Sequence, residues 1–260
     1  MISQSKIPIS LSLISISNKI DGLFTRTMRS VLAVLSASPG CTIQYIIVCP
    51  VELDSGNAFI LDSFCSGRPW IQVSLVIDQG KGIYAAMNKG IACALSCGST
   101  HISFINAGDQ LLPDYCILVK RAIDNRDKVL SGLIKVIDVA QDNKCESYEG
   151  GVMCWNVPHP ATIYPLSIFS ARCYHEYLRI SADWHFHFSL RNQIGFMRCR
   201  DLVVAAFYTD GISNSLESSS ILLKDELRQL SHEISQWNFS CFHPVRSFRL
   251  LKIAIISLFS

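Results

Sequence analysis

The sequence predicts an α/β protein whose doubly wound, mostly parallel sheet is followed by a helical C-terminal tail. Short apolar runs with the two-residue alternation of strands are separated by segments whose apolar residues recur at helical spacing. Each connection is long enough for a crossover helix, and this alternation is typical of parallel sheets covered on both faces. The 260 residues, 49% of them hydrophobic and 17% charged, allow one large domain with a substantial core.

The first half of the chain carries the clearest alternation. Ile9, Leu11 and Leu13 alternate with serines, which predicts a first strand that stops at Asn18. A helix is expected next, from about Leu23 to Ser36. Further strands are expected at Thr42–Cys49, Gln72–Ile77 and His101–Asn106.

Two helices are expected around the fourth strand. Ile83, Met87 and Ile91 fall at helical spacing, so Tyr84–Cys97 is predicted to be a helix whose amino end points toward the strand tips. Pro113 suits the first turn of the next helix, because proline lacks the N–H that a first turn leaves unpaired.

The second half is less regular. Val129–Val139 predicts an added pair of strands, and Gln141–Gly151 is polar enough to predict a loop. The remaining elements are expected to be a helix over Ser181–Leu190, a strand over Gly195–Phe207 and an amphipathic helix over Leu216–Trp237.

Composition excludes several classes of protein. A formal net charge of only +2 gives no field that would attract nucleic acid, so no nucleic-acid partner is expected. Eleven scattered cysteines without a Cys-x-x-Cys pair predict free thiols in a reducing cytosol. The first 17 residues lack the features of a signal peptide, and no segment offers the roughly 20 apolar residues that a membrane span needs.

The stretch from Asp78 to Asp109 carries the strongest functional signal. Gly80 and Gly82 stand where a strand turns into a helix, an arrangement that directs backbone N–H groups toward an anion such as a diphosphate. The alternative is an ordinary turn, because glycines alone are weak evidence. The spacing is neither a P-loop nor a Gly-x-Gly-x-x-Gly fingerprint, which disfavours nucleoside triphosphatases and dehydrogenases.

Asp109 follows the fourth predicted strand, at the edge where open α/β sheets bind ligands. A carboxylate there is suited to hold a hard cation against a diphosphate. The alternative is a turn residue ahead of Pro113.

Five stretches of the chain, in order, resemble segments of one known family. They are Gly82–Tyr84 with Ala86–Ile91, Phe104–Asp109, Pro158–Thr162, Arg179–Trp184 and Asp210–Ser213. They look like the GIYDAMNKGI segment, the DxD element, the segments that precede and contain the catalytic base, and the closing turn of family 2 nucleotide-sugar glycosyltransferases. These enzymes have the GT-A fold, and the resemblance is greatest to bacterial members that assemble surface polysaccharides. The resemblance runs from about residue 10 to residue 213, and the ordered set is far more specific than any one segment.

The resemblance implies an inverting, metal-dependent transfer of a sugar from a nucleoside-diphosphate sugar to a glycan or lipid-linked acceptor. It implies that Asp183 is the base that removes the proton of the acceptor hydroxyl, and that Asp109 binds Mg²⁺ or Mn²⁺ at the diphosphate. The expected donor-binding residues are Asn18, Gly80, Lys81, Gly82, Asn88 and Asn106, and the expected acceptor-side residues are His159 and Trp184.

Departures from the family pattern keep two other functions open. Cys49 stands after the second strand, where the family usually has an acidic residue for the nucleoside base, and Gly80 and Ala85 stand where it often has Asp. A non-catalytic member that binds carbohydrate or nucleotide is therefore one alternative. Asp183, taken alone, is also typical of a helix cap.

A metal-dependent hydrolase is the other alternative, because Asp183, His185 and His187 are possible zinc ligands. The two histidines are two residues apart on a predicted helix, so they should point to different faces. Tyr84, Met87 and Trp184 are candidates to line a sugar site, although such residues at helical spacing are more often core.

The chain is expected to divide into a GT-A domain, residues 1–213, and an amphipathic helical tail, residues 214–260. The tail places Arg246, Arg249 and Lys252 among bulky apolar residues, which favours either a helix lying on an anionic membrane surface or a helix packed on the domain. The expected location is the cytoplasm, with peripheral attachment to the inner face of the membrane under the first interpretation.

Overall fold

The computed structural model describes residues 10–37, 40–78, 80–138, 144–209 and 218–235. The strands are β1 Ser10–Ile16, β2 Thr42–Cys49, β3 Ile71–Ile77, β4 His101–Asn106, β5 Gln110–Leu111, β6 Lys128–Asp138, β7 Lys144–Tyr148, β8 Thr162–Pro165 and β9 Gly195–Tyr208. The α-helices are α1 Gly22–Ser36, α2 Ser55–Cys65, α3 Ile83–Ser96, α4 Tyr115–Asp124, α5 Ala182–Leu190 and α6 Ser218–Ser235. Short 3-10 helices cover His159–Ala161 and Leu166–Phe169.

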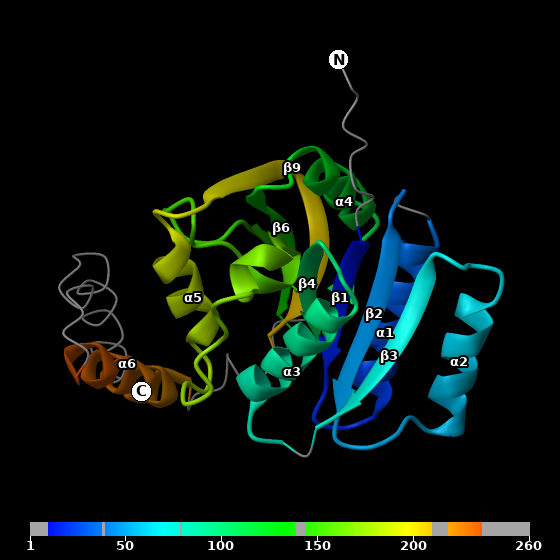
Figure 1. Cartoon of the computed structure of the whole chain (residues 1–260), viewed down its shortest axis with the longest axis horizontal. Coiled ribbons are helices and arrows are strands. Elements are labelled where there is room, and N and C mark those ends of the chain that lie inside the picture. Colours follow the sequence, from blue (N-terminus) through cyan, green and yellow to red (C-terminus); the bar gives the residue numbers. More distant parts are fainter. Residues whose placement is uncertain (1–9, 38–39, 79, 139–143, 210–217, 236–260) are drawn as a thin grey trace.

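One sheet joins all of these strands, in the order β3-β2-β1-β4-β8-β6-β9-β5, with β7 paired to β6 (Figure 1). The first four strands of this order are parallel. Ile16 is in register with both Val48 and Asn106, so the carboxyl ends of these strands lie at one edge of the sheet. The chain leaves this edge at Asn18, Cys49, Asp78 and Asn106, which places all four at the rim where ligands bind in open α/β sheets.

The other half of the sheet is mixed. β8 pairs antiparallel with both β4 and β6, whereas β6 and β9 run parallel over most of their length. β5 follows Asp109 directly and pairs antiparallel with β9, with Gln110 opposite Ala206. This pairing ties the turn after β4 to the far side of the sheet.

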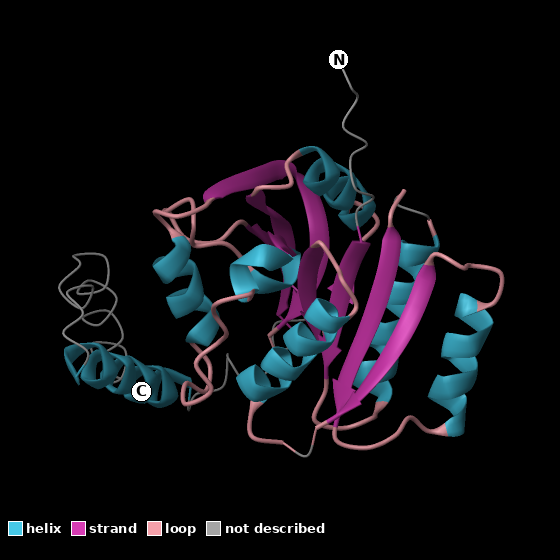
Figure 2. Ribbon diagram, viewed as in Figure 1, coloured by secondary structure: helices cyan, strands magenta, loops and turns pink. Residues whose placement is uncertain are grey.

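Helices cover both faces of the sheet, as Figure 2 shows. α1 and α4, with part of α2, pack on one face through residues such as Phe24, Met28 and Leu118. α3 and α5 pack on the other face through residues such as Met87 and Phe186. The two apolar clusters on either side of the parallel strands are what a doubly wound arrangement requires.

Two expectations for the middle of the chain are wrong. Where Val129–Val139 was expected to form a pair of strands, Lys128–Asp138 forms one long strand, β6. Gln141–Gly151, expected to be a loop, contains β7 over Lys144–Tyr148, which pairs with β6 alone. An edge strand with a polar sequence lacks the apolar alternation by which strands are recognised.

α6 lies beside α5 at the end of the molecule away from β3 (Figure 1). Its buried residues include Asp225, Glu226 and Gln229. Within the part of the chain that the structure describes, no helix is both long and apolar enough to cross a membrane. Residues 236–260, including the basic residues of the expected tail, lie outside the described residues.

Candidate active site

Asp183 lies in the first turn of α5 and is partly exposed. The hydroxyl of Tyr84 donates a hydrogen bond to Asp183 Oδ1 at 3.0 Å. Tyr84 belongs to the first turn of α3, the helix that starts just after the carboxyl edge of the parallel strands. The contact therefore brings together two segments, 99 residues apart, that the sequence assigned to the donor turn and the base.

Tyr84 is the donor in this pair. Its burial, and after that the charge of Asp183, raise the pKa of Tyr84 well above its usual value of 10.0, so the phenol keeps its proton. A carboxylate can only accept at neutral pH. The hydrogen bond thus fixes one oxygen of Asp183 and orients the other.

A wall of aromatic and imidazole rings lies behind Asp183. Tyr174 packs against Tyr84 with ring centroids 5.5 Å apart, and Phe104 stacks on His159 at 4.9 Å. His159 Nε2 is 3.0 Å from the Tyr174 hydroxyl. Because Phe104 precedes Asn106 by two residues on β4, this wall reaches from Asp183 to the carboxyl edge of the sheet.

His159 of the wall and His187 of α5 are both neutral. Burial lowers the pKa of His159, an effect that the charge of Asp183 opposes. Burial also lowers the pKa of His187 to about 4, and its Nε2 is 2.7 Å from the Tyr164 hydroxyl. Neither imidazole therefore carries a positive charge that would pair with Asp183 at neutral pH. His159 is only 9% exposed, so its ring supports the site from behind.

The turn before α3 has the backbone geometry expected of an anion cradle. Gly80 and Gly82 have φ angles of +82° and +112°, which glycine adopts without strain. Gly82 is the N-cap of α3 and, as a glycine, has no side chain to cap the N–H groups of the first turn. Lys81 between them is exposed. The sequence GKG therefore leaves helix N–H groups and a cation at the rim of the sheet.

A cavity of about 310 Å³ adjoins this turn. Its polar lining comes from Asp78, Lys81, Asn88, Lys89 and Glu176. The carboxylate of Asp78 is only 6% exposed and accepts a hydrogen bond from Lys89 Nζ at 2.5 Å. Of the expected donor-binding residues, Lys81 and Asn88 both line this cavity, beside Asp78 at the end of β3.

The amide of Asn88 is engaged with the backbone of another segment. Its Nδ2 donates to Tyr174 O at 2.9 Å and to Glu176 Oε1 at 3.0 Å, while its Oδ1 accepts from Tyr174 N at 3.0 Å. Asn88 thereby holds the segment that leads to α5. The structure gives this residue a positioning contact where the sequence suggested a direct contact with the donor.

The turn that carries Asp109 is fastened to α1 and β9. Thr27 Oγ1 donates to Asp109 O at 2.6 Å and accepts from Gly108 N at 3.0 Å. Asp109 is 6% exposed, and its Oδ1 accepts from Tyr208 N at 3.4 Å. Asn106 Oδ1 is buried and has no hydrogen-bond partner among the described residues.

Oxygen atoms of this kind suit a hard cation. Mg²⁺ and Mn²⁺ take carboxylate and amide oxygens, and Mg²⁺ normally completes its shell with water and phosphate. The donor set of Asp109 and Asn106 therefore fits such an ion together with a diphosphate. In the described part of the chain, no group of three or more His, Cys, Asp or Glu residues is arranged to hold a metal.

The remaining candidates are dispersed. Asn18 is exposed just after β1. Trp184 stacks on Phe188 at 5.3 Å and meets Trp155 edge-on at 5.4 Å. His185 contacts Glu226 of α6, whereas His187 bonds Tyr164 of β8. The two histidines thus face different elements, as their two-residue spacing predicted, and do not form a joint metal site with Asp183.

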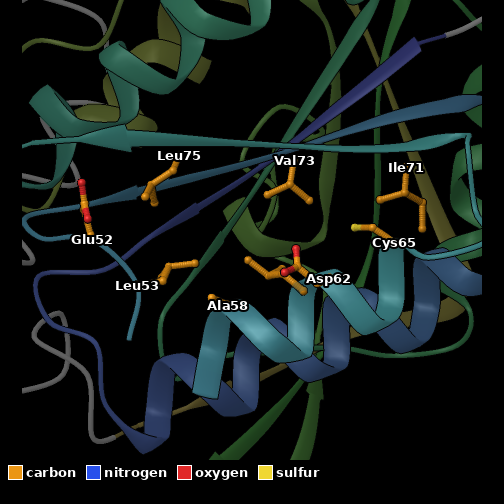
Figure 3. A pocket seen from close by; sticks show the side chains of 9 residues that line it. Glu52, Leu53, Ala58, Asp62, Cys65, Ile71, Val73 and Leu75 are labelled. Atoms are coloured by element: carbon orange, nitrogen blue, oxygen red, sulfur yellow. The ribbon is translucent and has the colours of Figure 1, made fainter. Parts of the chain in front are cut away.

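A second cavity, of about 370 Å³, lies between α2 and β3. Figure 3 shows Ile71, Val73 and Leu75 of β3 directed toward Asp62 and Cys65 of α2. It contains none of the expected site residues. Asp54, an acidic residue that follows Cys49 by five positions, caps α2 by accepting from Asn57 N at 2.9 Å.

Two contributors to the site were missed in the sequence. Tyr174 joins the wall behind Asp183, and Asp225 of α6 contacts the segment before α5. Tyr174 lies in an irregular segment with no periodicity to reveal it. Asp225 looked like the solvated face of an amphipathic helix, and only the fold shows that it is buried.

No protein-family model matches the sequence, and no curated protein matches it. Solved structures do match the fold. S. aureus TarS 1-349 in complex with UDP-GlcNAc has a TM-score of 0.59 at 14% identity, covering 84% of this chain and 66% of that one. The mannosyltransferase PcManGT from Pyrobaculum calidifontis, in complex with GDP-Man and Mn²⁺, has a TM-score of 0.60 at 10% identity, covering 96% of this chain and 74% of that one.

The chain has the GT-A fold. GalNAc-T7 with UDP, GalNAc and Mn²⁺ is a third similar structure, with a TM-score of 0.54 at 14% identity over 78% of this chain and 44% of that one. The similarity confirms the predicted fold class, a doubly wound and mostly parallel sheet. The chain spans slightly less than two thirds of TarS 1-349 and less than half of GalNAc-T7.

Proposed function

We propose that the chain is an inverting glycosyltransferase that moves a sugar from a nucleoside-diphosphate sugar to a glycan or lipid-linked acceptor in cell-surface polysaccharide synthesis. The observation that carries the proposal is the hydrogen bond from Tyr84 to Asp183 at the carboxyl edge of the parallel strands. It leaves a partly exposed carboxylate, oriented on one oxygen, beside the glycine turn. The similar structures that contain UDP-GlcNAc and GDP-Man support a nucleotide-sugar donor.

The proposed reaction needs one base and one leaving-group site. The second oxygen of Asp183 takes the proton of the acceptor hydroxyl while the acceptor's own oxygen forms a bond to the anomeric carbon. The bond from the anomeric carbon to the diphosphate breaks on the opposite side, which inverts the configuration. Because His159 and His187 are neutral, neither places a competing positive charge beside Asp183.

The leaving diphosphate is assigned to the other half of the site. The uncapped N–H groups at the start of α3 and the cation of Lys81 suit its negative charge. Asp109 and Asn106 would hold Mg²⁺ or Mn²⁺, which supplies positive charge to the departing phosphate oxygens when it is bound. Asn18 and Gly80 stay predicted donor contacts, and Trp184 and His159 stay predicted to support the acceptor side.

Replacement of the base tests the proposal. Asp183→Asn should lower transfer by a factor on the order of a hundred or more while nucleotide binding persists, because removal of general-base catalysis costs 10² to 10⁴ in rate. The assay uses a panel of UDP- and GDP-sugars with Mg²⁺ or Mn²⁺, beginning with UDP-GlcNAc and GDP-Man. Asp201→Asn is the matched control, because this exposed carboxylate pairs with Arg121 at the protein surface.

Other outcomes identify the alternatives. Nucleotide-sugar binding without turnover by the unaltered protein would favour the non-catalytic member. Activity that needs Zn²⁺ and no nucleotide sugar would favour the hydrolase. Wild-type transfer by Asp183→Asn would contradict the assignment of the base.

We also propose that the protein acts in the cytoplasm and attaches peripherally to the membrane through residues 236–260. The basic and apolar composition of this segment supports the proposal, since each cation near an anionic surface adds about 1 kcal/mol of attraction. Removal of residues 242–260 should abolish flotation with anionic liposomes. Equal recovery of the shortened and full chains would refute it.

A further inference from the structure

The segment that leads into α5, the helix that carries Asp183, is bound by a carboxylate of α6. Ser181 is the N-cap residue of α5, yet its side chain makes no capping bond to the helix. Asp225 Oδ2 of α6 instead accepts from Arg179 N at 2.7 Å, Ile180 N at 2.9 Å and Ser181 Oγ at 3.3 Å. Asp225 is 0% exposed, so these bonds form without competition from water.

The next residue of α6 holds α5 on the other side of Asp183. Glu226 is also 0% exposed, and its Oε1 is 3.1 Å from His185 Nε2. Asp183 lies midway in sequence between Ser181 and His185. Two adjacent acidic residues of α6 therefore contact the chain on both sides of the candidate base, Asp225 just before α5 and Glu226 within it.

The segment before α5 depends on such contacts because residues 170–181 form no helix or strand. Its backbone amides cannot be satisfied by a ladder of regular structure. The amides of Tyr174, Arg179 and Ile180 are instead bound by two side chains, Asn88 from α3 and Asp225 from α6. The direction of the Asp183 side chain is set by where these contacts place the start of α5.

We propose that Asp225 is a positioning residue for catalysis, acting on Asp183 through the turn at residues 179–181. This inference rests on the proposed function, in which Asp183 is the base. Asp225 keeps the carboxylate of Asp183 within reach of the Tyr84 hydroxyl on one side and of the acceptor on the other. Displacement of a reacting group by about 1 Å is enough to cost about a hundredfold in rate.

Two substitutions of Asp225 test this role. Asp225→Ala removes the acceptor of both amides and should lower kcat by a factor on the order of ten to a hundred. Asp225→Asn keeps one acceptor oxygen and should be intermediate. KM for the donor should change little in both, because no residue of α6 lines the cavity beside the glycine turn. Leu227→Ala is the matched control on the same helix, since Leu227 is 53% exposed.

Hydrogen exchange supplies a readout that does not depend on turnover. Asp225→Asn should speed exchange of the amides of residues 179–186, and Leu227→Ala should leave them unchanged. Thermal unfolding and circular dichroism establish whether each variant is folded. If Asp225→Ala does not fold, the kinetics and hydrogen exchange of Asp225→Asn alone test the positioning role.

Failure of the positioning role can be distinguished from failure of the proposed function. If Asp183→Asn is inactive while folded Asp225 variants keep wild-type kcat, the positioning role is wrong and the proposed function stands. Unchanged exchange at residues 179–186 in Asp225→Asn also overturns the positioning role. If Asp183→Asn keeps wild-type turnover, the proposed function fails, and the positioning role fails with it.

Discussion

Acidification should destabilise the protein through His187, whose side chain is buried against Tyr164. Burial lowers the pKa of His187 to about 4 in the folded chain, whereas an imidazole in the unfolded chain titrates near 6.5. Between these values the unfolded chain binds a proton that the folded chain does not. The free energy of unfolding is therefore unaffected above about pH 6.5 and falls as the pH drops from there to about 4.

The size of the effect follows from the two pKa values. Each tenfold change in proton affinity corresponds to about 1.4 kcal/mol, so this histidine should remove about 3 kcal/mol of stability by pH 4. His187→Gln keeps a polar group opposite the Tyr164 hydroxyl and does not titrate. Between pH 7 and pH 4, the wild-type protein should therefore lose about 3 kcal/mol more than the variant does.

Urea unfolding followed by tryptophan fluorescence, repeated across this pH range, measures the difference. Leu227→Ala serves as the control, because Leu227 is 53% exposed and carries no titratable group, so its loss should leave the pH dependence as in the wild type. If wild type and His187→Gln lose stability in parallel, the burial of a neutral imidazole does not govern the acid sensitivity, and the reasoning is refuted.

Three further results are expected. Tyr84→Phe should lower kcat about ten- to a hundredfold with little change in donor KM, since a hydrogen bond to a charged group contributes about 1.5–3 kcal/mol. Steady-state kinetics checks this prediction, and an unchanged kcat would contradict the orienting role of Tyr84. Gly90→Ala should destabilise the chain by about 1 kcal/mol despite the higher helix propensity of alanine, because the added Cβ would lie 2.7 Å from Ile14 Cγ2. Urea unfolding measures this change. A variant more stable than the wild type would show that Ile14 moves aside at little cost. Chelation of divalent cations should abolish transfer, and Asp109→Ala should raise the Mn²⁺ concentration needed to restore it; a variant with an unchanged Mn²⁺ requirement would argue against Asp109 as a ligand.

The sequence predicts the parallel half of the fold closely. β2 and β4 occur at the residues expected, because each is a compact apolar run between turn residues. α2 was not anticipated, since only Asn57 and Leu61 of it are buried and no apolar stripe marks it. β8 is four residues long and ends at a proline, which is too short for a periodic signal.

The site is less predictable because side-chain direction depends on tertiary packing. The motifs that contain Tyr84 and Asp183 can each be recognised in the sequence, but the two residues are 99 positions apart and only the fold shows their hydrogen bond. Asn88 has the same amide whether it faces a ligand or the backbone of Tyr174. The burial of Asp225 is equally invisible, because an acidic residue in an amphipathic helix is ordinarily solvated.

The contact between Asp225 and the amides of Arg179 and Ile180 has a consequence for the order of folding. The ribosome completes the whole sheet, as well as α5, before it adds the residue that binds these amides, which lies 46 positions after Arg179. Irregular segments with unpaired amides open readily. We therefore expect the carboxylate of Asp183 to become fixed only after α6 has been made, so that a polypeptide ending before Asp225 would not yet carry out the proposed transfer.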